Sequence, residues 1–405
     1  MTRHDRTALL EQDTALFGAK VVRVCPHGGY SPWCAVCRSS QCAPALDMAK
    51  DRTAAGTAID RQPTPPRDQV FRPWCRRPHT GRIPAMTLPP STAARSVSVG
   101  AVFRPQSAPE RLAGAARAAD AAGLDELWLW EDCFLAGGIS AAAIALANSQ
   151  RLKVGIGVLP VPMRNVALTA MEIATLDRAY PGRIRVGVGH GVQDWMAQIG
   201  EKVASPMTLL REYVTVLSAL LRGERVTHDG RYVKLADVGL DWPPERNIEL
   251  LLGAEGPRTL ALSGELASGT VITGGTSPDR LREALRHISI GHAERVEPKP
   301  HSTVVYLICA TGPDPERRVR DELSYWQLDA SQDLAVYGTA EEIAAGAKRW
   351  IDAGAETIVF QPPAGADVDA FIDVIGRQVR PLIAMSPSEP HPVSPPSPRR
   401  GGISG

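Results

Sequence analysis

Between residues 96 and 383 the hydrophobic positions follow two alternating patterns. Short runs rich in Val, Ile and Leu, typical of strands buried on both faces, are each followed by longer runs with the spacing of amphipathic helices. The strand-like runs are 96–103, 124–130, 151–160, 182–189, 248–254, 269–275, 302–310 and 356–363. The helical runs are 108–123, 137–150, 166–179, 205–223, 256–267, 277–296, 314–326, 339–354 and 368–383.

A repeated order of strand and helix is the pattern of βα units on a parallel sheet, and eight strands predict a (β/α)8 TIM barrel. A doubly wound sheet is the competing fold. It would place a G-x-G-x-x-G turn after the first strand, whereas this strand ends in FRPQ. Segments 192–204 and 224–247 are expected to be insertions that shape the substrate site. The second contains VTHDGRYVKL, which predicts a hairpin.

The barrel pattern defines a domain over residues 96–385, and the flanking segments differ from it in composition. Residues 1–95 show no helical or strand period and include a stretch rich in Pro and Arg, so we expect a loosely ordered extension and linker. Met86 would be a natural start if that extension is not part of the enzyme. Residues 386–405 are rich in Pro and Ser and are expected to form a disordered tail.

The cysteines gather in the N-terminal extension, which contains five of the seven. Cys25, Cys34, Cys37 and Cys42 include one C-x-x-C pair with irregular outer spacing, which is a weak signal for zinc. The alternative for residues 1–60 is therefore a small zinc-binding module. No metal is expected in the barrel.

Charge and hydropathy exclude several classes of partner. The formal net charge is +1 and the basic residues are not clustered, so capture of nucleic acid or of an anionic membrane is not expected. No apolar run approaches the roughly 18 residues that a membrane-spanning helix needs. The N-terminus carries acidic residues and lacks the apolar core of a secretory signal. A cytoplasmic enzyme acting on a small molecule is the expectation.

Barrel enzymes place their functional residues at the carboxyl ends of the strands, where this chain offers three candidate proton donors. Glu131 and Asp132 follow the second strand and His190 follows the fourth. Adjacent residues on an extended segment point to opposite faces. At most one of the two acids is therefore expected to face the barrel mouth, while the other caps or pairs with a neighbouring helix.

Glycines and helix starts dominate the other strand ends. Glycine lets a backbone approach a ligand closely, and the first turn of a helix binds anions through free N–H groups. Two neighbouring strands end in such turns, which predicts a ligand carrying phosphate. The residues selected there are Ala254, Glu255, Gly256, Pro257, Thr273 and Gly274, with Thr276 or Ser277 as the cap of the second helix.

Four segments in order resemble the luciferase-like monooxygenase superfamily, whose barrel enzymes use FMN or the deazaflavin coenzyme F420. The resemblance covers about residues 96–383. Its most specific pieces are RLKVGIGVLPVPMRNVALTAMEIATLDRAYPGRIRVGVGHG, PMTLLREYVTVLSALLRGERVTHDGRYVKL, GAEGPRTLALSGELASGTVITGG and YGTAEEIAAGAKRWIDAGAETIVF.

The resemblance implies roles for particular residues. Gly157–Val158 corresponds to the position where several members carry a non-prolyl cis peptide pressed against the coenzyme ring. Gly189, His190 and Gly191 resemble the loop beside that ring, and the turn 254–257 resembles the phosphate-binding turn. A homodimer is expected on the resemblance alone.

Two departures argue against the sugar-phosphate dehydrogenases of that superfamily. Many members carry His after the acid that ends the second strand, where this chain has Cys133. The sugar-phosphate enzymes carry a carboxylate two residues after the His190 position, where this chain has Val192.

The resemblance implies an oxidoreductase that passes hydride to an electron-poor C=C or C=N bond or, with FMN, oxygenates a small organic substrate. Coenzyme F420 is favoured because GIGVLPVPMRN is closest to the members that use it. A barrel glycosidase is the alternative and would pair Glu131 or Asp132 with Asp194 or Glu255. Few aromatic residues at the strand ends argue against it.

Overall fold

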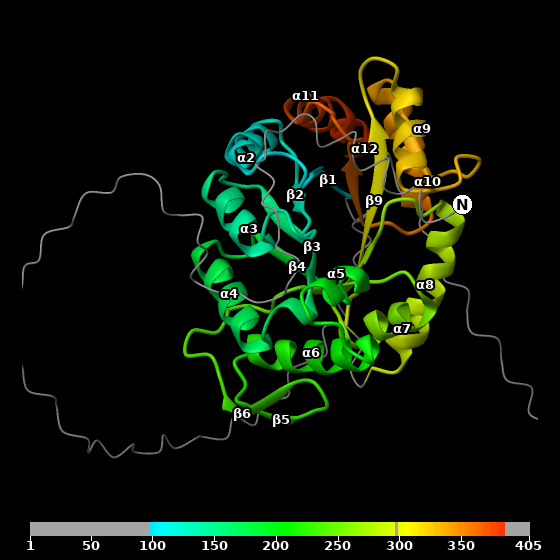
Figure 1. Ribbon diagram of the computed structural model, residues 1–405. Helices are drawn as coiled ribbons and strands as arrows, with labels where there is room; N and C mark the ends of the chain where they lie inside the picture. Colours follow the sequence, from blue (N-terminus) through cyan, green and yellow to red (C-terminus); the bar gives the residue numbers. More distant parts are fainter. Residues whose placement is uncertain (1–96, 296–298, 385–405) are drawn as a thin grey trace, which may run out of the picture. The chain divides into compact units, whose positions relative to one another are not determined.

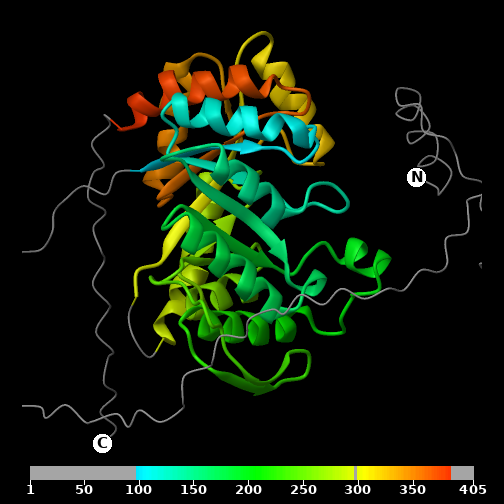
Figure 2. The same cartoon turned by 90° about the vertical axis from the view of Figure 1, so that its left-hand side faces the viewer.

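The computed structural model describes residues 97–295 and 299–384, which form a closed parallel barrel surrounded by helices (Figures 1 and 2). The predicted eight-stranded barrel is therefore confirmed. The barrel strands are β1 Ser98–Phe103, β2 Glu126–Leu129, β3 Lys153–Pro160, β4 Ile184–Gly189, β7 Leu250–Gly253, β8 Gly269–Ile272, β9 Ser302–Ala310 and β11 Thr357–Gln361. The predictions for residues 1–95, for residues 386–405 and for the four N-terminal cysteines concern parts of the chain outside the described residues.

Strand pairing closes the barrel in the order β1, β2, β3, β4, β7, β8, β9, β11 and back to β1, with every neighbouring pair parallel. The predicted hairpin forms a separate antiparallel pair, β5 Val226–Asp229 and β6 Lys234–Val238. A short strand that the hydrophobic pattern did not predict, β10 Ala335–Tyr337, pairs with the end of β9.

Apart from one short helix in the predicted insertion 192–204, the helices lie where the hydrophobic pattern predicts them, and some of their starts are set by local capping. Asn165 accepts a hydrogen bond from the Ala167 N–H at the start of α4, and Thr339 and Glu342 form a capping box on α10. The helices are α2 Leu112–Ala121, α3 Gly138–Ala147, α4 Val166–Ala179, α5 Gln193–Gln198, α6 Pro206–Leu221, α7 Pro257–Leu266, α8 Pro278–Ala293, α9 Pro315–Tyr325, α10 Ala340–Asp352, α11 Val368–Val374 and α12 Arg380–Ala384.

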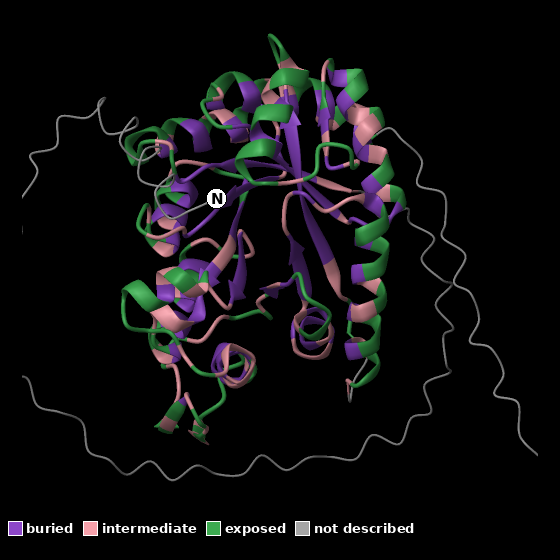
Figure 3. Cartoon of the chain, turned by 45° about the vertical axis from the view of Figure 1, so that its right-hand side comes forward, coloured by how far each residue is buried: buried purple, intermediate pink, exposed green. Residues whose placement is uncertain are grey.

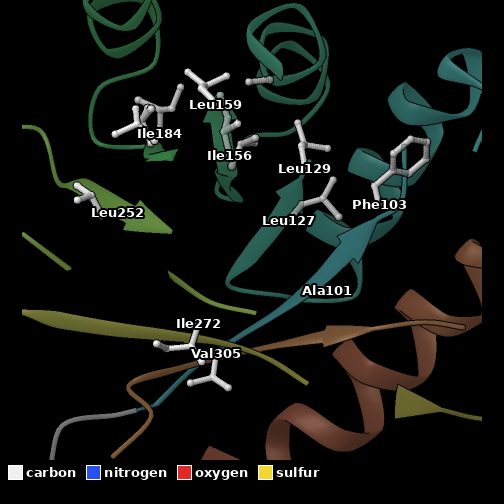
Figure 4. Packing of buried hydrophobic residues seen from close by; sticks show 14 of the residues in the cluster. Ala101, Phe103, Leu127, Leu129, Ile156, Leu159, Ile184, Leu252, Ile272 and Val305 are labelled. Carbon is white, nitrogen blue, oxygen red and sulfur yellow. The ribbon is translucent and has the colours of Figure 1, made fainter. Parts of the chain in front are cut away.

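The main hydrophobic core lies between the barrel and its helices (Figures 3 and 4). Outward-facing strand residues such as Leu127, Leu129, Ile156 and Leu159 pack there against helix residues and are fully or almost fully buried. Burial on both faces explains why the strands are continuous apolar runs and lack alternating polarity.

The barrel interior is filled by two layers of a different character. At the amino-terminal end, the guanidinium of Arg185 donates hydrogen bonds to Glu126, Glu249, Thr357 and Ser302. Above it lies a second cluster of buried residues that includes three aromatic side chains, Trp128, Trp130 and Tyr306, and the rings of Trp128 and Tyr306 meet edge to face with centroids 5.8 Å apart. This aromatic layer is the floor on which the strand-end cavity rests.

Across residues 97–295 and 299–384, no helix is long and apolar enough to span a bilayer.

Candidate active site

A cavity of about 630 Å³ opens at the carboxyl ends of the barrel strands. Nearly every residue predicted from the strand ends lines it. These are Glu131, Asp132, Gly157, Val158, Gly189, His190, Gly191, Ala254, Glu255, Gly256, Thr273 and Gly274. Pro257 is absent from the lining and begins α7 directly behind it. Asp194, the glycosidase candidate, is also absent from the lining.

The third strand carries a bulge beneath this cavity. The register between β3 and β4 shifts between Ile156 and Leu159, and the Gly157–Val158 peptide is cis, where the family resemblance places such a bond. A second non-prolyl cis peptide, Cys133–Phe134, follows β2 and has no signal in the sequence. The bulge turns the backbone of β3 toward the interior of the mouth.

Three glycines of neighbouring strands make room for the Val158 side chain. A Cβ atom on Gly187, Gly189 or Gly253 would lie 2.8–2.9 Å from a methyl carbon of Val158. The side chain nearest to such a Cβ at all three positions is Val158. The glycines therefore act through Val158, because they let the β3 bulge settle onto β4 and β7.

Glu131 is a buried carboxylate that holds the start of α3. Its Oε1 accepts hydrogen bonds from the backbone N–H of Gly138 and from Arg164, with which it forms an ion pair. Arg164 also pairs with Glu172 on α4 at 3.1 Å. Of the two adjacent acids, Glu131 thus takes the capping and pairing role.

Asp132 is half-buried at the cavity and is electrostatically different from its neighbour. No hydrogen bond from residues 97–295 or 299–384 reaches its carboxylate, and burial raises its pKa against the opposing attraction of Arg104. A cavity carboxyl group with a raised pKa keeps its proton to a higher pH than an exposed aspartate does, which suits it to proton donation.

His190 lies on the loop after β4, with its Nε2 atom 3.2 Å from the Thr259 hydroxyl of α7. Burial lowers its pKa, partly offset by the Pro206 carbonyl, so the imidazole is neutral at pH 7. The side chain therefore contributes a hydrogen-bonding group without a charge.

The two predicted helix starts follow neighbouring strands, β7 and β8. Gly256 is the N-cap of α7 with Pro257 at its first position, and Ser277 caps α8 by accepting from the Arg280 N–H at 3.3 Å. The Thr273 hydroxyl donates to Glu255 at 2.7 Å, which joins the two turns. The first turn of α7 reaches the cavity through Gly256 and Thr259.

The opposite side of the cavity contains the residues that strand ends did not reveal. Tyr306 and Ile308 come from within β9, and Trp326 and Leu328 follow α9. Tyr306 could have been found from the alternation of β9, since Val304, Tyr306 and Ile308 share one face.

Trp326 and Leu328 reach the mouth because α9 is an insertion. β10 runs parallel to β9 and pairs Ala335 with Ile308 and Tyr337 with Ala310, so the chain must return to the carboxyl end before α10 begins. The connection to β11 is therefore made by α10, and segment 311–337 is a third insertion beside the two predicted ones. The hydrophobic pattern alone does not distinguish such a helix from a barrel helix.

A closed parallel barrel with a strand-end cavity, a buried carboxyl group and a helix start at its edge is the architecture of barrel enzymes. The family profile described as luciferase-like monooxygenase matches residues 90–357. The chain therefore belongs to the luciferase-like monooxygenase family, and the predicted resemblance is confirmed. This membership leaves the glycosidase alternative without support.

Among curated proteins, the chain is similar to a 5,10-methylenetetrahydromethanopterin reductase of Methanolobus tindarius, with 24% identity over 70% of this chain and 99% of the relative. It is also 28% identical to a coenzyme F420-dependent glucose-6-phosphate dehydrogenase of Kineococcus radiotolerans, over 69% of this chain and 94% of the relative. A solved coenzyme F420-dependent secondary alcohol dehydrogenase matches with a TM-score of 0.64 at 20% identity, covering 71% of this chain and 99% of that one.

The described residues hold no group of three or more His, Cys, Asp or Glu side chains arranged to bind a metal. Cys133 and Cys309 are both free thiols.

Proposed function

We propose that this protein is an oxidoreductase that binds coenzyme F420 in the strand-end cavity and acts on a small organic molecule. The observation that carries the proposal is one cavity lined both by the β3 bulge at Gly157 and Val158 and by the first turn of α7. Two of the similar proteins carry coenzyme F420 in their names. The proposed cytoplasmic location rests on the hydropathy and N-terminal composition of the sequence, and the proposed homodimer rests on the resemblance alone.

The residues present fit a flat ring with a phosphate-bearing tail. The bulge at Gly157–Val158 offers a backbone surface for the ring, and the α7 start at Gly256 offers N–H groups for the phosphate. Glu131 Oε2 is buried without a hydrogen-bond partner in the described chain, so it can accept from a ligand hydroxyl or N–H.

When bound and reduced, the coenzyme supplies a hydride to an electron-poor C=C or C=N bond. The protein then has to provide a proton, orientation and exclusion of water. Asp132 is placed at the cavity to donate the proton, and burial raises its pKa and so favours the protonated carboxyl group. His190 and Thr259 orient the ligand edge as a hydrogen-bonded pair, and Glu131 positions α3 through its ion pair.

Fluorescence titration with coenzyme F420 and with FMN tests the proposal. We expect saturable binding of coenzyme F420, followed by its oxidation when a panel of enones and imines is added to the reduced complex. Binding of FMN alone would replace hydride transfer by oxygenation with O₂. Binding of neither coenzyme would overturn the proposed function.

Gly256→Asp locates the phosphate within the cavity. Aspartate is a favourable N-cap, so α7 should still form, but its carboxylate would repel a phosphate at that turn. We expect coenzyme affinity to fall by about tenfold or more. Ser277→Asp, the same change at the cap of α8, is the matched control and should leave the affinity unaltered, since Ser277 lies outside the cavity lining.

A further inference from the structure

The strand order divides the cavity into two halves of different composition. The ends of β3, β4, β7 and β8 are consecutive around the barrel and contribute most of the glycines. The other half is formed by β9, β11, β1 and β2 together with segment 311–337. It contributes Trp130, Asp132, Tyr306, Ile308, Trp326 and Leu328.

The aromatic half offers apolar contact surface from three directions. Trp130 and Tyr306 meet edge to face with ring centroids 5.8 Å apart at the floor. Trp326 and Leu328 form the outer wall, where Trp326 keeps 41% of its surface exposed. Beside Asp132, Phe134 and Leu135 are 61% and 53% exposed on the loop after β2, so the approach is apolar as well.

Among residues 97–295 and 299–384, the lining of this cavity contains neither Lys nor Arg. Two basic side chains close to its acidic residues, Arg104 and Arg164, are paired within the protein. Arg104 is buried and pairs with Glu322 at 2.5 Å, and Arg164 pairs with two glutamates. On the side of the cavity formed by β9, β11, β1 and β2, the lining offers the carboxyl group of Asp132 and no basic side chain, so a substrate anion would gain no partner there.

Glu322 fixes the position of the outer wall. Its buried carboxylate accepts hydrogen bonds from the Trp326 indole N–H at 2.7 Å, the Arg104 guanidinium at 2.5 Å and the Ala364 N–H at 2.8 Å. These donors come from the end of α9 and from the loops after β1 and β11. Trp326 is therefore held as a preorganised surface even though its ring is partly exposed.

We propose that the aromatic half is the substrate subsite and that it takes an uncharged, predominantly apolar organic molecule, held against Trp326, to the exclusion of phosphorylated or carboxylated substrates. The proposal rests on the proposed function in one respect, because it assigns the glycine-rich half to the coenzyme. It gives Trp326 and Leu328 the role of specificity residues and Glu322 that of a positioning residue.

A matched pair of probes tests the proposal by calorimetry on the protein saturated with oxidised coenzyme. 2-Acetylnaphthalene is a neutral ketone, and 2-naphthoate is an anion of nearly the same size and shape. We expect the ketone to bind at least about tenfold more tightly than the naphthoate, and glucose 6-phosphate to show no binding. Equal or tighter binding of the naphthoate, or no binding of the ketone, would overturn the proposal.

Substitutions at the cavity test where the probe binds. Trp326→Ala should weaken ketone binding by about tenfold through loss of the aromatic contact. Trp242→Ala, a 72%-exposed tryptophan outside the cavity lining, is the matched control and should have no effect. Leu328→Arg introduces the missing cation and should reverse the preference toward the naphthoate. Unchanged ketone affinity in Trp326→Ala, or an unaltered preference in Leu328→Arg, would contradict the subsite assignment.

Coenzyme titration of the same samples separates the two proposals. Failure to bind either coenzyme counts against the proposed function. Normal coenzyme binding combined with the wrong probe preference counts against the substrate class alone.

Discussion

At the residue scale, Glu131 and Asp132 take different roles because their surroundings differ. Glu131 forms an ion pair with Arg164 and accepts a hydrogen bond from a backbone N–H. Asp132 is partly buried, and its carboxylate accepts no hydrogen bond from the described residues. Alternation along an extended chain predicted that the two roles would separate. It could not predict which acid would take which role, because Arg164 follows a different strand, 33 residues further along the chain.

Asp132→Asn should abolish proton donation while preserving shape. We expect turnover with any substrate found in the panel to fall by about 100-fold or more, with coenzyme affinity unchanged. In the unaltered enzyme the rate should decline as pH rises through the raised pKa of Asp132, because only the protonated carboxyl group donates. Steady-state rates across pH 5–9 measure both effects, and a variant with full activity would remove Asp132 from the mechanism.

The same substitution has an opposite effect on stability. The pKa of Asp132 is higher in the folded than in the unfolded chain, so the folded state binds more protons and loses stability as pH rises through that interval. Asparagine does not ionise. Urea unfolding should therefore show Asp132→Asn to be more stable than the natural protein at pH 8, with a smaller advantage at pH 5.

At the element scale, two glycines set the distance between α7 and α8. A Cβ on Gly291 would lie 1.7 Å from the Ala261 carbonyl oxygen, and one on Gly264 would lie 2.0 Å from the Ile288 carbonyl oxygen. Both obstacles are backbone atoms, which cannot rotate away. The first turn of α7, the proposed phosphate site, is therefore positioned by a contact on the far side of the helix.

Gly291→Ala should separate these helices and lower the free energy of unfolding by about 3 kcal/mol. It should also weaken coenzyme binding, because α7 carries Gly256 at its start. Gly114→Ala is the matched control, because Gly114 lies within α2 and a Cβ there would have no other atom within 4 Å. This substitution should stabilise the protein by about 0.5–1 kcal/mol. Urea unfolding of both variants gives the comparison, and equal effects would refute the packing explanation.

At this scale, the sequence predicted the elements whose residues carry a local signal. The eight strands are continuous apolar runs, and α4 spans the predicted residues 166–179 because Asn165 caps it. β10 is only three residues long and exists through its pairing with β9, so no local pattern predicts it. Trp326 and Leu328 depend on that pairing for their place in the cavity, which explains why the aromatic wall was missed when the glycine-rich half was found.

At the scale of the whole molecule, Arg185 links five of the eight barrel strands near their amino-terminal ends. Its partners Glu126, Glu249, Ser302 and Thr357 belong to or adjoin β2, β7, β9 and β11, and Arg185 itself lies on β4. Burial and the two glutamates act in opposite directions on its pKa, and the glutamates prevail and raise it. The barrel interior therefore contains a buried guanidinium group that is paired with carboxylates.

Arg185→Met should lower the free energy of unfolding by about 3–5 kcal/mol, because Glu126 would remain buried and unpaired. The double variant Arg185→Met with Glu126→Gln removes that charge while leaving an oxygen for the Trp128 N–H, which donates to Glu126 at 2.7 Å. We expect it to be more stable than the single Arg185 variant. Denaturant unfolding measures both, and a double variant that is less stable would show that the arginine matters through packing.

Glu322 anchors the insertion 311–337 by hydrogen bonds to the loops after β1 and β11. The outer wall of the mouth is therefore one continuous stretch of chain, held by Glu322 and by the pairing of β10 with β9, while the glycine-rich half is encoded by other strands. Recombination between related barrels could therefore replace segment 311–337 and change which substrates are accepted. The new segment would need a glutamate that pairs with Arg104. Substrate repertoire and redox chemistry could then diversify independently within one scaffold.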